Sequence, residues 1–392
     1  MQASDRITHL NPGGDDGWGL YQRSKAMVAQ GIPVAELTIG EHDIGTDARI
    51  LDAMAAAAAA GNTGYAPVPG MDRLRDAIAA RVTAQSGIAT TRDNVAVTPG
   101  GQAGLFAAHI ATVDPGDAAL MIDPYYATYP GTLRAAGARP VIVPSFADDG
   151  FQPSVKALDT AARSGARSLL INTPNNPTGA VYSHATLEGV ANVVTAWNMW
   201  LISDEVYDSQ VWHGTHISPR ALPGMAERTL VVGSLSKSHA MTGSRLGWIV
   251  GPEDTIAAIH NLSTATTYGV AGFIQEAGLH ALSLGPQFEA EIAAPFRRRR
   301  DLLLGKLDHQ QVLRAVPPDG AMYVMVDVRG TGLTGEAFAE ALLEHERIAV
   351  MPGASFGKAA IGHIRVALTL PDAAFDEATD RLINFAIKVA SI

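Results

Sequence analysis

The stretch Val231-Val232-Gly233-Ser234-Leu235-Ser236-Lys237-Ser238-His239-Ala240-Met241-Thr242-Gly243-Ser244-Arg245 organises the rest of this sequence. A short apolar run, typical of a buried strand, leads into small hydroxyl residues, one lysine and, eight positions later, an arginine. Ser234, Ser236 and Arg245 suit a phosphate, because arginine forms charge-assisted bidentate bonds with that group. A lysine beside a bound phosphate indicates an aldehyde cofactor held as a Schiff base. Taken alone, the stretch fits a surface lysine after a buried strand better than it fits a cofactor site. The other motifs decide between these two interpretations.

Composition limits the classes to which the chain can belong. Its 392 residues, 47% of them hydrophobic, suffice for a large core and two or three domain-sized units. The net charge of -10 argues against nucleic acid or an anionic membrane as the main partner. The absence of cysteine excludes disulfides and thiolate metal sites, and we predict no metal site. Without a signal-peptide pattern or a membrane-length apolar run, we expect a cytoplasmic location.

Short apolar runs alternate with amphipathic stretches from residue 95 onward. This alternation predicts an α/β fold, in which helices flank a mostly parallel sheet and ligands bind beyond the carboxyl ends of the strands. The expected strands are residues 95–97, 118–122, 140–143, 168–171, 200–203, 229–232 and 247–250.

The two ends of the chain are expected to form a second, smaller α+β domain. Residues 1–45 are too short to hold a core alone, so we expect them to pack on residues 286–392. The remaining residues, 46–285, form the large cofactor-binding domain, in which Thr46 is expected to cap the first helix. The arginine run at residues 297–300 predicts a solvated, salt-bridged helix face.

Three further motifs follow predicted strands. Gly100-Gly101-Gln102 opens a helix whose backbone N–H groups can face an anion, although an ordinary turn fits as well. Asn172-Thr173-Pro174-Asn175-Asn176-Pro177-Thr178-Gly179 holds an amide rigidly between prolines, unless it is simply a turn. Asp204-Glu205-Val206-Tyr207 places a carboxylate at a strand end, where it needs either a cationic partner or a loop to cap.

Along the chain, the glycine-rich helix start, the asparagine motif, the Asp204 motif and the lysine stretch follow one another. Four motifs in this order resemble the class I/II aminotransferases, pyridoxal-phosphate enzymes related to aspartate aminotransferase. The resemblance covers almost the whole chain. It implies pyridoxal 5′-phosphate as the cofactor, a homodimer, and a small domain built from both termini. It also implies that Lys237 forms the internal aldimine and moves the proton, and that Asp204 pairs with the pyridinium nitrogen. Tyr207 and Asn176 would bind the cofactor's 3-oxygen.

The resemblance assigns further residues to the cofactor and the substrate. Ser234, Ser236 and Arg245 would bind the phosphate together with the helix start at Gly100, Gly101 and Gln102. Tyr126 would stack on the pyridine ring, and Tyr65 would reach the phosphate of the partner subunit. Arg365 would clamp the substrate α-carboxylate near Gly40 and Asn176. A lone arginine in the apolar stretch His363-Ile364-Arg365-Val366-Ala367 is costly unless it binds an anion, the alternative being a structural ion pair.

The implied function is an aminotransferase that moves the amino group of an L-α-amino acid to a 2-oxo acid. Because 2-oxoglutarate is a common acceptor in this family, the resemblance implies it as the acceptor here. A lyase that eliminates a β- or γ-substituent on the same scaffold would share every motif. A ligand-sensing module, of the kind fused to regulators, is the third alternative.

Three positions depart from the usual family pattern. His42 stands where proline is usual in Gly-Glu-Pro-Asp, and Ser244 stands where an aromatic residue often precedes the arginine. Gln102 replaces a lysine with which one acidic-substrate branch binds the distal carboxylate. The last change weakens an assignment to aspartate. We expect specificity to lie in the loops at residues 12–20, 38–46 and 264–272.

Overall fold

A seven-stranded sheet forms the larger part of the molecule. The computed structural model describes residues 1–11 and 18–391, so part of the expected specificity loop at residues 12–20 lies outside the described residues. The strand order is β2-β8-β7-β6-β5-β3-β4, and all neighbours are parallel except β8, which is antiparallel to β2 and β7. The strands are β2 (Val95–Thr98), β3 (Ala118–Asp123), β4 (Arg139–Pro144), β5 (Ser168–Asn172), β6 (Trp200–Asp204), β7 (Thr229–Ser234) and β8 (Gly247–Val250). The predicted α/β class is confirmed.

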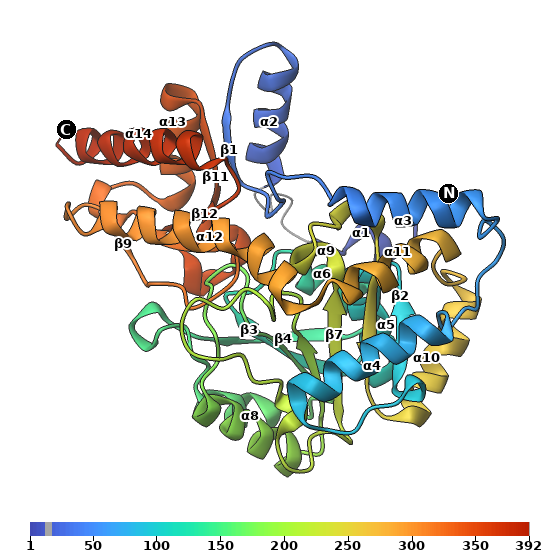
Figure 1. Cartoon of the computed structure of the whole chain (residues 1–392). Coiled ribbons are helices and arrows are strands. Elements are labelled where there is room, and N and C mark those ends of the chain that lie inside the picture. Colours follow the sequence, from blue (N-terminus) through green and yellow to red (C-terminus); the bar gives the residue numbers. More distant parts are fainter. Residues whose placement is uncertain (12–17, 392) are drawn as a thin grey trace.

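Helices cover both faces of this sheet, which explains why its central strands are buried throughout and mostly apolar (Figure 1). Successive residues serve opposite faces: Leu169 packs in the core on one side of β5, and Leu170 in the core on the other side. The helices of this part are α3 (Ala48–Ala59), α4 (Asp72–Ser86), α5 (Gly101–Thr112), α6 (Tyr129–Ala135), α7 (Val155–Ala162), α8 (His184–Ala196), α9 (Leu235–Ser238), α10 (Glu253–Ala265) and α11 (Gly272–Ser283).

A second sheet has five strands in the order β1-β11-β12-β10-β9 and joins the two ends of the chain. β1 (Ala35–Leu37) pairs in parallel with β11 (Ile348–Pro352), so residues near the N-terminus pack on the C-terminal part (Figure 1). The exact boundaries at residues 46 and 285 stay a prediction. The other elements here are α1 (Asp5–Thr8), α2 (Trp18–Ala29), α12 (Gly285–Leu307), β9 (Arg314–Ala315), β10 (Tyr323–Asp327), α13 (Gly335–Glu346), β12 (His363–Ala367) and α14 (Asp372–Ala390).

The segment between β1 and α3 differs from expectation in its capping. Asp47, not Thr46, caps α3, because its carboxylate accepts a bond from the backbone N–H of Arg49. The Thr46 hydroxyl instead donates to the carbonyl of Ala240, at 2.7 Å. Thr46 therefore ties this segment to the lysine loop.

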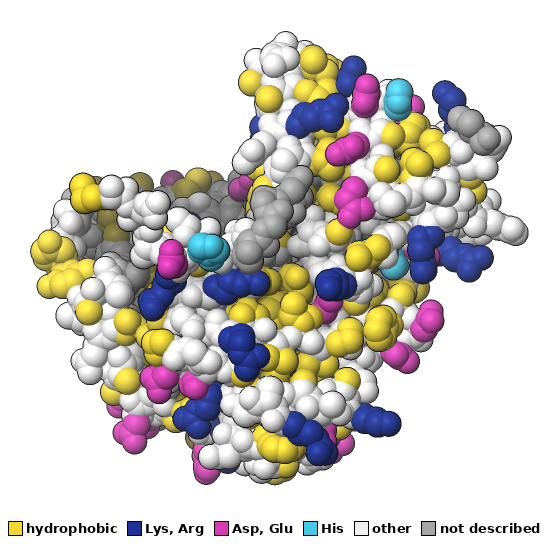
Figure 2. Space-filling view, turned by 180° about the vertical axis from the view of Figure 1, so that it is seen from behind, with side chains coloured by type: hydrophobic (Ala, Val, Ile, Leu, Met, Phe, Trp, Pro, Cys, Tyr) yellow, Lys and Arg dark blue, Asp and Glu magenta, His cyan; other side chains and the backbone are white. Residues whose placement is uncertain are grey.

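The surface carries charges of both signs. On the face shown in Figure 2, Lys and Arg side chains are interspersed with Asp and Glu. Among the described residues, no helix is long and apolar enough to cross a membrane. Arg299 departs from the expected solvated face: its side chain is 4% exposed and pairs with Asp43 and Asp372.

Candidate active site

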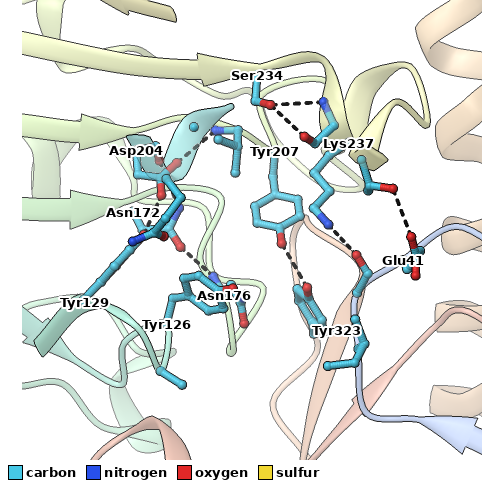
Figure 3. Close-up of a pocket in the computed structure, with 18 of the residues that line it drawn as sticks. Glu41, Tyr126, Tyr129, Asn172, Asn176, Asp204, Tyr207, Ser234, Lys237 and Tyr323 are labelled. Atoms are coloured by element: carbon cyan, nitrogen blue, oxygen red, sulfur yellow. Dashed lines mark hydrogen bonds between the residues drawn. The ribbon is translucent and has the colours of Figure 1, made fainter. Parts of the chain in front are cut away.

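A cavity of about 280 Å³ opens at the carboxyl ends of β5, β6 and β7, where the second sheet faces them (Figure 3). Most of the predicted site residues line it. They are Gly40, Gly101, Gln102, Tyr126, Asn176, Asp204, Tyr207, Ser234, Ser236, Lys237, Arg245 and Arg365. Gly100 directly precedes α5 as its N-cap.

Lys237 lies just beyond β7, on the one-turn helix α9. Its Nζ donates a hydrogen bond to the carbonyl oxygen of Gly40, which arrives from β1 (Figure 3). Burial lowers the pKa of Lys237 to about 8, because removing the ammonium from water disfavours the charged form. The amine is thus closer to neutral than an ordinary lysine, as a proton-transfer group or nucleophile requires.

Asp204 ends β6 and is 4% exposed. The Tyr129 hydroxyl donates to its Oδ2 at 2.6 Å, and the backbone N–H of Val206 donates to its Oδ1 at 3.3 Å. No salt bridge reaches Asp204 from any described residue, and burial raises its pKa to about 6. A buried carboxylate in this state suits a cationic ring nitrogen, which would supply the missing positive partner.

The asparagine motif after β5 is fastened to the end of β6. Asn172 donates from Nδ2 to the carbonyl of Asp204 at 2.9 Å, and its Oδ1 accepts from the backbone N–H of Asn176 at 2.7 Å. The Asn176 side chain in turn accepts from Nη1 of Arg365 at 2.8 Å. These bonds fix the Asn176 amide at the sheet edge, as the sequence predicts.

Two small hydroxyls, a helix start and an arginine form a cradle for an anion. Ser234 donates to Ser236 at 2.9 Å, and both lie beside the N-terminus of α5. Gly100 has φ 82°, and a Cβ there would lie 2.3 Å from Nη2 of Arg245. Glycine is therefore required at this position so that the guanidinium can approach the helix start. The group fits a phosphate.

Arg365 on β12 is 3% exposed. Its guanidinium lies 4.3 Å from the ring centres of both Tyr323 and Phe356, and its Nη2 donates to the carbonyl of Thr38. No carboxylate among the described residues pairs with it, and its Nε is buried without a partner. The alternative of a structural ion pair therefore finds no support, and the residue suits a carboxylate ligand.

Sequence reasoning missed several residues of this cavity, among them Tyr129, Asn172 and Tyr323. Asn172 was the first residue of a quoted motif, so its position after a strand was a usable signal. Tyr129 lies three residues after Tyr126 on the unexpected helix α6. The Tyr323 hydroxyl lies 2.9 Å from that of Tyr207, but 116 residues separate the two and no local signal links them.

Tyr65 lies apart from this group. Its side chain is 91% exposed, and it is not among the residues that line the cavity. Its ring makes an edge contact with Tyr268, with ring centres 5.1 Å apart. The chain alone therefore does not bring Tyr65 to the cradle.

Comparisons with known proteins extend over nearly the whole chain. The sequence model of the family described as aminotransferase class I and II matches residues 32–382. The chain is 41% identical over 383 residues to the arginine–pyruvate transaminase of Pseudomonas aeruginosa, and the aligned region covers 97% of each protein. It is 36% identical to the aspartate/prephenate aminotransferase of Thermus thermophilus, over 90% of this chain and 91% of that protein. The structure of the aspartate aminotransferase from T. thermophilus with maleate matches with a TM-score of 0.92 at 34% identity, covering 99% of this chain and 100% of that one.

Proposed function

We infer the function of this chain from the family to which it belongs, the pyridoxal-phosphate-dependent class I and II aminotransferases. The chain is therefore a transferase of amino groups, and the predictions of family, fold and cofactor are confirmed. Relatives over nearly the full length are named as aminotransferases, so the eliminating lyase on the same scaffold is not favoured.

We propose that the cavity residues hold the cofactor in the roles that the sequence predicts. The carboxylate of Asp204 would hold the ring nitrogen, and the cradle at Ser234, Ser236 and Arg245 would hold the phosphate. When bound, the cofactor supplies an electron sink next to the substrate nitrogen. The buried carboxylate of Asp204, which has no cationic partner among the described residues, and the space that Gly100 leaves for Arg245 support this assignment.

The chain's own residues position the substrate and move its proton. Arg365 binds the α-carboxylate, and the rings of Tyr323 and Phe356 hold its guanidinium from both sides. Lys237 carries the α-proton on Nζ, for which a pKa of about 8 is well matched to neutral pH.

The substrate class follows from the cations of the cavity. Among the described residues that line it, the positive groups are Lys237, Arg245 and Arg365, and each already has a role. Gln102 is neutral and one N–H of its amide donates to Thr132 at 2.7 Å, so it offers a second carboxylate no charge-assisted bond. In the sequence, the loops at residues 12–20, 38–46 and 264–272 and the Tyr65 loop contain no lysine or arginine. A second substrate carboxylate would therefore lack a cationic partner.

We propose that the acceptor is a 2-oxo acid with a single carboxylate, such as pyruvate, and that the donor has a neutral or basic side chain. The absence of a fourth cation around the described cavity carries this proposal. Glu41 at the cavity adds a negative charge suited to a basic donor such as L-arginine, and the P. aeruginosa relative is named for arginine and pyruvate. Family habit instead favours 2-oxoglutarate, which remains the alternative acceptor.

A charge added at Gln102 tests this substrate class. We expect the unaltered enzyme to prefer pyruvate over 2-oxoglutarate by about tenfold or more in kcat/KM, since an unpaired second carboxylate costs on the order of 1–3 kcal/mol. Gln102→Lys should raise activity with 2-oxoglutarate and L-aspartate, whereas the uncharged control Gln102→Met should not. Equal use of both acceptors by the unaltered enzyme would refute the proposal.

We also propose a homodimer in which Tyr65 reaches the active site of the second copy. The outward position of Tyr65 and its contact with Tyr268 support this arrangement. Sedimentation should give twice the chain mass, and Tyr65→Ala should weaken cofactor retention; a monomer that keeps full activity would contradict it. A cytoplasmic location and the absence of nucleic-acid partners stay predictions.

A further inference from the structure

The main-chain carbonyl of Lys237 needs partners from outside its own helix. α9 spans only Leu235–Ser238, so it provides no N–H four residues further on inside the helix. Two side chains fill this place: Nε2 of His42 lies 2.9 Å from the carbonyl oxygen, and Nε2 of Gln210 lies 3.3 Å from it. Gln210 is fully buried, on the loop that follows β6.

His42 meets this carbonyl at a cost. A carbonyl only accepts, so Nε2 of His42 must carry the proton, which leaves Nδ1 buried without a partner. Burial and the neighbouring charge of Lys237 lower the pKa of His42 to about 4, although the hydrogen bond to the Lys237 carbonyl and the charge of Asp43 oppose this, so the ring is neutral at physiological pH. A phenyl ring would fill the same space beside Phe296 without an unpaired nitrogen, so shape alone does not account for the histidine.

The same short segment also holds the other end of Lys237. Two residues before His42, the carbonyl of Gly40 accepts a hydrogen bond from Nζ. Glu41 accepts from the Thr242 hydroxyl at 3.0 Å, which is a further contact to the lysine loop. The segment is itself anchored, because Arg299 on α12 pairs with Asp43 at 2.8 Å.

We propose that His42 is a positioning residue, which fixes the main chain of the catalytic lysine and holds the Gly40 carbonyl in reach of its amine. The side chain of Lys237 would then move its proton from a backbone that stays in place. The usual proline at this position has no side-chain donor, so this contact distinguishes the present chain from the common family pattern.

Three variants distinguish a His42 that positions the main chain of Lys237 from a His42 that only fills space beside Phe296. His42→Phe keeps a ring against Phe296 but removes the donor, and His42→Gln restores a donor of similar reach. The matched control is His260→Phe, since Nε2 of His260 also contacts a backbone carbonyl, that of Val95 at 3.2 Å, away from the cavity. Circular dichroism would verify that each variant folds.

The main measurement is the pH dependence with which acetic anhydride labels Lys237 in the full-length chain freed of cofactor, with Lys388 as the internal reference in peptide mass spectra. We expect His42→Phe to lower the labelling midpoint of Lys237 by about half a pH unit or more, because the ammonium loses its fixed acceptor at Gly40. With the cofactor restored, the half-reaction with an amino acid should slow by about tenfold. His42→Gln should return the midpoint to within about 0.3 pH unit and the rate to within about twofold of the original, and His260→Phe should leave both unchanged.

Two outcomes would contradict the positioning role of His42. Unchanged labelling and half-reaction rates in His42→Phe would overturn the proposal, as would a failure of His42→Gln to rescue them. If His42→Phe does not fold, His42→Leu removes the same donor with a smaller apolar side chain. It should lower the labelling midpoint in the same direction, and an unchanged midpoint in that variant would also overturn the proposal.

Discussion

The two sides of the cavity are built differently. On one side, Asn172, Asp204 and Ser234 stand at the carboxyl ends of neighbouring strands, and each belongs to a contiguous motif. On the other side, Gly40 and Tyr323 arrive from the second sheet and touch the first side through single contacts. The first side supplies Lys237 and Asp204, whose pKa values burial shifts, and the second supplies Arg365 and the contacts that position the lysine and Tyr207. Substitutions on the first side should therefore nearly abolish the reaction, whereas substitutions on the second side should lower its rate by smaller factors.

The largest effect is expected at Asp204. Asp204→Asn removes the negative charge that would hold the ring nitrogen, and we expect kcat to fall by about 10³-fold, a loss typical of a central electrostatic partner. Stability should change in the opposite direction. The pKa of Asp204 is raised from 3.8 to about 6 by burial, so the folded, cofactor-free chain binds more protons than the unfolded chain between these values, and its stability falls as pH rises from 4 to 6.

Asparagine cannot ionise, so Asp204→Asn removes the loss of stability that comes with the buried negative charge. Thermal unfolding of the cofactor-free chain should therefore show Asp204→Asn to be more stable than the original at pH 8, by about 2–3 kcal/mol, and nearly equal at pH 4. The control is Asp52→Asn, at an exposed carboxylate. A variant that loses stability equally at both pH values would show that Asp204 is a structural residue.

The second side should respond most at Gly40. A Cβ on Gly40 would lie 1.7 Å from the Tyr323 hydroxyl, so either the ring or the segment must shift. We expect Gly40→Ala to reduce kcat/KM by about 10²-fold, because a displacement of about 1 Å misplaces both the amine of Lys237 and the carboxylate site. Gly45 offers a matched control in the same segment, since a Cβ there meets nothing within 4 Å. Equal activities of Gly40→Ala and Gly45→Ala would show that the close approach is unimportant.

The same division explains what the sequence could predict. The seven strands of the large sheet were expected within one or two residues, because buried parallel strands are continuous apolar runs between turn signals. Lys237, Asp204 and Asn176 could be proposed as site residues because each lies in a contiguous motif, and all three line the cavity. The contacts of Thr46, His42 and Arg299 were not predicted, since their partners lie between about 70 and 260 residues away in the chain. A long-range hydrogen bond leaves no periodicity in the chain, so capping and burial at such positions depend on tertiary contacts.

The smallest effect is expected at Tyr323, and it tests how the two sides communicate. Tyr323→Phe keeps the ring that lies 4.3 Å from the Arg365 guanidinium and removes only the hydroxyl that faces Tyr207 at 2.9 Å. Loss of one such hydrogen bond should cost about 1 kcal/mol, or roughly fivefold in kcat/KM. A double-mutant cycle with Tyr207→Phe should show coupling of about this size, since removal of either hydroxyl already breaks the pair. Tyr323→Leu, which also removes the ring, should raise KM further because Arg365 loses its aromatic support. If the tyrosine pair proved additive while Leu still raised KM, the second side would act on substrate binding through Arg365 alone, and the hydroxyl contact between the two sides would have no catalytic role.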